Sequence, residues 1–141
     1  RGATCAEDGM NANPVRGSCL CGDVAYEVHG PLRNVVACHC LQCRKQTGHY
    51  LAAASARRDD VRFVRDASLR WFRSSAEAER GFCSRCGSVM FWRREGRPDL
   101  SITAGTIDGP TGVVTEGHIF CASKGDYYQI PDEGYRREGW T

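Results

Sequence analysis

The chain carries nine cysteines in 141 residues, and the spacing of seven of them constrains it more than any other feature. They form three short groups: C-x-C (Cys19, Cys21), C-x-C-x-x-C (Cys38, Cys40, Cys43) and C-x-x-C (Cys83, Cys86). Cysteines one or two residues apart seldom reach the geometry of an unstrained disulfide. The same spacing suits thiolates that converge on one tetrahedral metal ion. The sequence therefore predicts a metal-binding protein of a reducing compartment, and we expect it in the cytoplasm.

Composition indicates one ordinary globular domain, with 41% hydrophobic and 26% charged residues. The longest uninterrupted apolar stretch, Tyr50 to Ala54, is far too short to span a bilayer, so we expect no membrane partner. The formal charge is only +2. Binding of two Zn²⁺ by seven thiolates would change it to about −1. This charge argues against nucleic acid as a partner.

Short alternating segments predict an all-β fold of antiparallel strands with short helical turns only. The alternation covers residues 24–29, 61–65, 69–72, 88–93, 100–104, 118–121 and 127–130. One or two helical turns are expected from Cys40 to Thr47, ended by Gly48. We divide the chain into a loosely held segment at 1–16, a zinc-binding domain at 17–130 and a loosely held carboxy-terminal tail at 131–141.

Two of the cysteine groups have the form of zinc knuckles, because Gly22 follows Cys21 and Gly87 follows Cys86. A glycine after the last ligand relieves the tight turn that directs backbone amides at the sulfurs. We therefore expect Cys19, Cys21, Cys83 and Cys86 to form one closed, structural zinc site. The alternative is a reactive dithiol in the C-x-x-C, but it lacks the βαβ context of redox motifs.

The third group (Cys38, Cys40, Cys43) offers three ligands and an unassigned fourth position, which is the pattern of a catalytic zinc. Arg44 and Lys45 follow it and would lower the thiol pKa values. A fourth protein ligand would close this site instead. The candidates are His39, His49, His118 and Cys121. His39 is disfavoured because both its neighbours are ligands, whereas closure by His118 or Cys121 stays open.

These motifs resemble the glutathione-dependent formaldehyde-activating enzyme family, and centromere protein V is similar in the same residues. The resemblance is carried by Gly17–Gly22 (GSCLCG), Cys38–Lys45 (CHCLQCRK) and Phe82–Gly87 (FCSRCG), supported by residues 103–108 and 118–124. It extends from about Gly17 to Ile130. Cys121 and Gly125 depart from the family pattern, where an apolar residue and an alanine are usual. Cys5 lies outside every motif and is taken as incidental.

The resemblance implies a zinc-bound β-tent of twisted antiparallel sheets, with two Zn²⁺ per chain and glutathione as co-substrate. It implies a structural zinc at the two-knuckle quartet and a labile, catalytic zinc at the Cys38, Cys40 and Cys43 triplet. The implied activity is that of a carbon–sulfur lyase that forms or cleaves S-hydroxymethylglutathione from glutathione and formaldehyde. The substrate partner would be a small-molecule thiol conjugate.

A base must also handle the hydroxyl proton, and His118, His49 and Lys124 are the candidates, with His118 preferred as a catalytic residue. Glutathione carries two carboxylates, so Arg44, Lys45 and Lys124 are the candidate contacts. The alternative function is a noncatalytic zinc β-module that binds glutathione, a protein or a nucleic acid.

Overall fold

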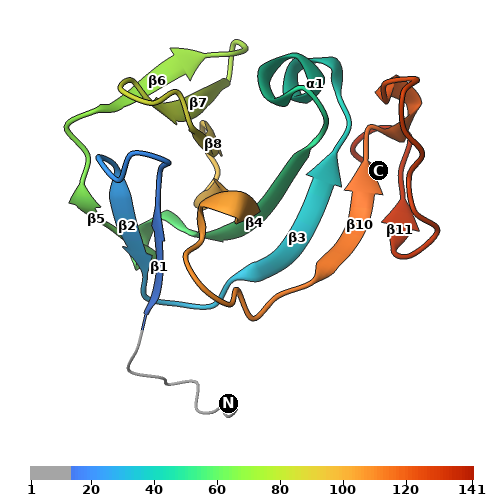
Figure 1. Ribbon diagram of the computed structural model, residues 1–141. Helices are drawn as coiled ribbons and strands as arrows, with labels where there is room; N and C mark the ends of the chain where they lie inside the picture. The colour runs from blue at the N-terminus through green and yellow to red at the C-terminus, as the bar shows by residue number, and fades with distance from the viewer. Residues whose placement is uncertain (1–13) are drawn as a thin grey trace.

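The computed structural model describes residues 14–141, which fold into two β-sheets and one short α-helix (Figure 1). The smaller sheet has the order β1 (Val15–Ser18), β2 (Ala25–Val28), β5 (Val61–Arg65). The larger sheet has the order β11 (Tyr135–Arg136), β10 (Thr115–Ile119), β3 (Arg33–Cys38), β4 (Leu51–Arg57), β9 (Asp99–Thr103), β8 (Val89–Arg94), β7 (Ala78–Cys83), β6 (Leu69–Arg73). The helix α1 spans Leu41–Thr47, and 3₁₀ turns cover Arg58–Asp60, Ala104–Thr106 and Cys121–Ser123. The expected all-β class is confirmed.

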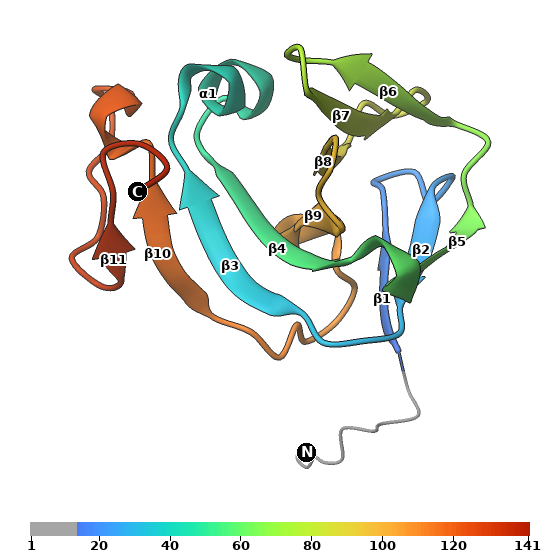
Figure 2. The same ribbon diagram turned by 180° about the vertical axis from the view of Figure 1, so that it is seen from behind.

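The pairing is antiparallel throughout except at β10, which runs parallel to both β3 and β11. The long curved strands β3 and β4 form the middle of the larger sheet, and α1 connects them at one end (Figures 1 and 2). No helix within residues 14–141 is long and apolar enough to cross a membrane.

The two faces of the larger sheet have different surroundings, because successive side chains on a strand point to opposite faces. On one face Ala54, Phe91 and Ile102 pack against Tyr26 of the smaller sheet and form the main core. Their chain neighbours, including Ala53, Trp92 and Ser101, line a cavity on the other face. The period-two alternation that predicted the strands therefore also separates core residues from the residues that line the cavity.

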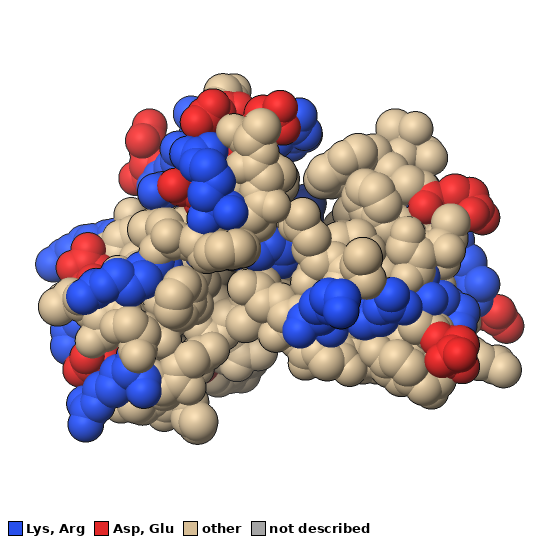
Figure 3. All heavy atoms as spheres, turned by 90° about the horizontal axis from the view of Figure 1, so that it is seen from above, with Lys and Arg blue, Asp and Glu red and all other residues tan. Residues whose placement is uncertain are grey.

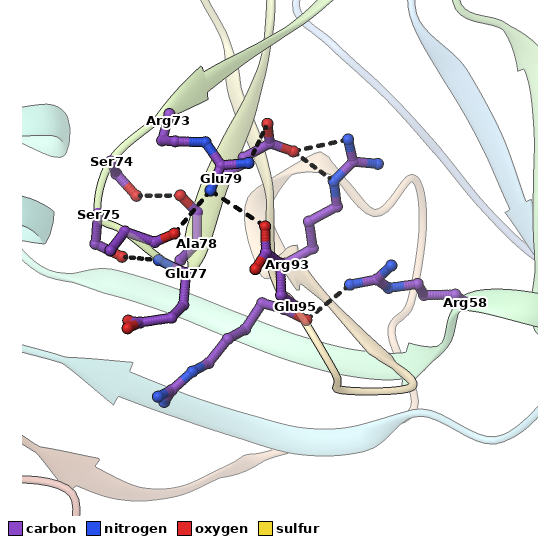
Figure 4. Close-up of polar contacts among 11 residues, drawn as sticks. Arg58, Arg73, Ser74, Ser75, Glu77, Ala78, Glu79, Arg93 and Glu95 are labelled. Carbon is purple, nitrogen blue, oxygen red and sulfur yellow. Dashed lines mark hydrogen bonds and ion pairs between the residues drawn. The ribbon is translucent and has the colours of Figure 1, made fainter.

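Ion pairs reinforce strands β6 to β8. Arg93 donates to Glu79 at 2.8 Å, and Arg73 lies 3.4 Å from Glu79 and 3.5 Å from Glu95 (Figure 4). Glu79 is the chain neighbour of the buried Arg80, which faces the cavity. Because neighbouring side chains of a strand point to opposite faces, this network stabilises β7 on the face opposite to Arg80 and the cavity.

Two sequence expectations need correction. Residues 127–130 form no strand, because the Lys124 ammonium closes a turn by donating to the Gly125 and Tyr128 carbonyl oxygens. The tail from residue 131 is attached rather than loose, since β11 pairs with β10 and Arg137 N–H donates to the His118 carbonyl oxygen. Cys5 and most of the expected amino-terminal segment lie outside the described residues.

Candidate metal and substrate site

The four cysteines of the two expected knuckles come together between β1 and the β7–β8 turn. Their sulfurs all lie within 4.8 Å of one another, with Cys19 Sγ 3.6 Å from Cys21 Sγ and Cys21 Sγ 3.8 Å from Cys83 Sγ. Four sulfurs at Zn–S distances of 2.3 Å in a tetrahedron would be about 3.8 Å apart. The quartet therefore fits a tetrahedral zinc ion.

The backbone around the quartet has the knuckle geometry. Gly22 and Gly87 have φ values of 83° and 81°, in the left-handed region that favours glycine. The Val24 N–H donates to Cys19 Sγ at 3.2 Å, and the Arg85 N–H donates to Cys83 Sγ at 3.4 Å. These amides stabilise thiolate sulfur.

A serine completes the quartet's surroundings. The Ser88 hydroxyl lies 3.2 Å from Cys86 Sγ and lowers the pKa of that thiol to about 5. The same hydroxyl oxygen accepts the Leu20 N–H at 2.9 Å. Ser88 thus connects the two knuckles and favours the ionised form of Cys86.

The triplet lies where β3 ends and α1 begins. The Cys38, Cys40 and Cys43 sulfurs lie within 4.8 Å of one another, and the group has no fourth Cys, His, Asp or Glu from residues 14–141. Cys40 is the N-cap of α1, and its sulfur accepts the Cys43 N–H at 3.4 Å. Three thiolates with room for a fourth ligand fit an open zinc site.

A buried arginine accompanies the triplet. Arg80 on β7 is only 5% exposed, and both its Nη1 and Nη2 lie 3.6 Å from Cys43 Sγ. They also donate to Gln46 Oε1 at 2.9 Å and to Gln42 Oε1 at 3.1 Å. The pKa of Cys40 is lowered first by hydrogen bonds from Cys38 and Cys43, and the Arg80 charge acts in the same direction. Arg80 would therefore offset part of the negative charge that the three sulfurs carry as ligands of a metal ion.

The triplet lies in the wall of a cavity of about 630 Å³, in the size range of small-molecule sites. None of the quartet cysteines lines it. Its charged lining residues are four arginines and two acids: Arg33, Arg80, Arg94, Arg97, Glu77 and Asp99. Figure 3 shows a hollow between two lobes of the surface, with Lys and Arg side chains in and beside it. The cavity is thus net positive.

Two buried histidines and the half-buried Tyr128 form a hydrogen-bonded chain of neutral groups next to the triplet. His39 Nε2 is 3.1 Å from His118 Nδ1, and His39 Nδ1 is 2.6 Å from the Tyr128 hydroxyl. Burial lowers the pKa of His39 to about 4 and also lowers that of His118, while it raises the pKa of Tyr128. These two hydrogen bonds connect the loop that carries the triplet to β10 and to the segment after it.

The other sequence-predicted residues lie away from the cavity. Arg44, Lys45 and His49 do not line it, and Lys124 is occupied by backbone carbonyl oxygens. His118 is buried against His39 and does not line it either. Their roles in catalysis or in glutathione binding remain predictions. Cys121 is outside both sulfur clusters.

Sequence reasoning missed the residues that form the cavity wall. Arg80 lies on β7, Trp92 and Arg94 lie on β8, and no sequence motif pointed to any of them as a site residue. Their approach to the triplet depends on strand order, because β8 and β7 lie three and four strands from β3. In the structure Arg80 pairs in register with Trp92, which puts both on one face, and this pairing is not visible in the sequence.

The fold and the two sulfur clusters define the class: a small all-β protein with two cysteine sites that could bind metal, one closed and one facing a cavity. The glutathione-dependent formaldehyde-activating enzyme family matches residues 14–123, and the chain belongs to this family. A crystal structure of a Rhodobacter sphaeroides protein is similar, with 29% identity and a TM-score of 0.59, over 73% of this chain and 98% of that chain. A search of curated proteins finds no match.

Proposed function

We propose that the protein makes or breaks the carbon–sulfur bond of a glutathione adduct, with S-hydroxymethylglutathione as the simplest substrate. The observation that carries this proposal is the position of the triplet in the wall of a basic cavity. Membership of the family supports glutathione as the thiol. The free thiols of both clusters suit a reducing compartment such as the cytoplasm.

Zinc, held by Cys38, Cys40 and Cys43, would supply a Lewis acid that stabilises substrate sulfur as thiolate. Arg80 offsets the charge of the three protein thiolates, so a fourth, anionic sulfur meets less repulsion. In the forward direction the glutathione sulfur bonds to the carbonyl carbon of the aldehyde. The carbonyl oxygen takes up the proton that the thiol released.

The cavity also fits the charges of glutathione, which has two carboxylates and one ammonium group. The guanidinium groups of Arg94 and Arg97 line the cavity and make no ion pair or side-chain hydrogen bond with any residue of 14–141. We infer that they receive the carboxylates, and that Asp99 or Glu77 receives the ammonium group. Positioning of both ends brings the sulfur to the triplet.

The test is calorimetry of glutathione binding to zinc-loaded protein, joined to NMR exchange spectroscopy with ¹³C-formaldehyde. We expect binding below millimolar concentration and faster exchange between formaldehyde and S-hydroxymethylglutathione than in buffer. The double variant Arg94→Gln/Arg97→Gln should bind at least about tenfold more weakly. Arg70→Gln is the matched control, since the Arg70 guanidinium contacts only the Ala67 and Leu69 carbonyl oxygens. Undetectable binding at millimolar glutathione would support a noncatalytic zinc module instead.

A further inference from the structure

Three aromatic side chains form an apolar wall of the cavity: Trp92, Phe120 and Trp140. The Phe120 and Trp140 rings are 5.1 Å apart in an edge-to-face arrangement, and the Trp92 and Trp140 rings are 6.2 Å apart. Trp140 nonetheless remains 50% exposed. A half-exposed indole in the wall of a pocket offers a flat apolar surface to a ligand.

The carboxy-terminal segment is held in place by the backbone. Phe120 N–H donates to the Gly139 carbonyl oxygen at 3.2 Å, and Cys121 N–H donates to the Arg137 carbonyl oxygen at 3.0 Å. Phe120 itself has φ 56°, a left-handed conformation that is rare outside glycine. A strained aromatic residue fixed by these contacts indicates a site where the side-chain position matters.

This wall is built partly outside the segment that matches the family. The match ends at residue 123, whereas Trp140 arrives from the chain beyond it. The triplet comes from the β3–α1 region, and Ile119, the chain neighbour of Phe120, pairs with Cys38. The aromatic wall therefore begins beside the triplet, where it can contact the group attached to the substrate sulfur.

Formaldehyde adds only a hydroxymethyl group to glutathione and leaves an aromatic wall without a partner. We propose that the preferred substrate is a glutathione adduct whose sulfur substituent carries an aromatic ring, such as the hemithioacetal of an aromatic aldehyde. This inference rests on the proposed function. The bond changes are the same as for formaldehyde: the carbon–sulfur bond forms as the carbonyl oxygen gains the thiol proton.

The test compares the binding of glutathione, S-methylglutathione and S-benzylglutathione to the zinc-loaded protein by calorimetry. The benzyl derivative should bind at least about tenfold more tightly than the methyl derivative. Trp140→Ala should abolish this preference, so that the affinities for the benzyl and methyl derivatives differ by no more than about twofold. The matched control is Phe72→Ala, because Phe72 is 59% exposed and does not line the cavity.

The outcomes separate the two proposals. If all three ligands bind equally, the aromatic specificity is wrong while glutathione binding stands. If none binds, both proposals are wrong. Should Trp140→Ala fail to fold, nuclear Overhauser contacts in the unaltered protein decide the matter. Contacts between the benzyl ring and the Trp92 or Trp140 indole protons would support the inference, and their absence in a saturated complex would overturn it.

Discussion

Arg80 reaches Cys43 through both ends of its guanidinium group, with Nη1 and Nη2 each 3.6 Å from the sulfur. Arg80 lies on β7 and Cys43 lies in α1, so this contact joins the far side of the larger sheet to the triplet. Arg80 Nε is the one buried side-chain nitrogen or oxygen without a hydrogen-bond partner among the described residues. The guanidinium is therefore held by the sulfur and by two glutamines rather than by a carboxylate.

From this contact we expect Arg80→Gln to weaken metal binding at the triplet by about 10- to 100-fold, the usual effect of losing a residue that supports a metal ligand. The reason is that three thiolates lose their nearest positive charge. Arg80→Lys should have a smaller effect, because it keeps the charge and loses the two-pronged contact. Competition with a chromophoric chelator measures the affinity. An unchanged affinity in both variants would refute a role for Arg80 at the metal.

The quartet should determine stability. Cys83→Ser is expected to lower Tm by about 10 °C or more, since a closed structural zinc contributes directly to folding free energy. Thermal melting followed by circular dichroism, with zinc content by elemental analysis, gives the answer. Cys121→Ser is the control, because Cys121 belongs to neither cluster. A normally melting Cys83→Ser protein that retains two zinc ions would be incompatible with the quartet.

The two sites should differ in how readily they lose metal. A chelator is expected to remove one zinc ion per chain while the β-sheet spectrum stays native, and to remove the second only as the fold is lost. Cys40→Ser should eliminate the first phase with little loss of stability. Cys40 caps α1 through its side chain, and serine is a good N-cap in the same position. Simultaneous release of both ions would instead mean that the triplet is a second structural site.

A glycine variant tests the knuckle turn itself. Gly87→Ala should cost about 1 kcal/mol of unfolding free energy, because φ is 81° while the added Cβ meets no atom within 4 Å. Gly105→Ala is a matched control, since Gly105 has the same open space and no positive φ. Chemical denaturation measures both variants. Equal stabilities of the two variants would show that the turn does not require a left-handed residue.

The all-β class, the short helix after Cys40 and the grouping of the cysteines were predictable from the sequence. Each of these depends on neighbours along the chain: period-two alternation, Gly48 as a helix C-cap, and ligands one or two residues apart. The grouping of Cys19, Cys21, Cys83 and Cys86 could also be predicted, because a glycine follows Cys21 and another follows Cys86, as in two zinc knuckles that form one site.

The residues that surround the triplet could not be predicted in this way. Strand order brings Arg80 and Trp92 to the cavity, and backbone hydrogen bonds of the carboxy-terminal segment bring Trp140 there. Lys124 and His118, by contrast, carry suitable chemistry but have contacts elsewhere. Alternation assigns a side chain to one of two faces, yet long-range pairing determines what that face meets. The physical reason is that a strand's register and neighbours are set by packing across the whole sheet.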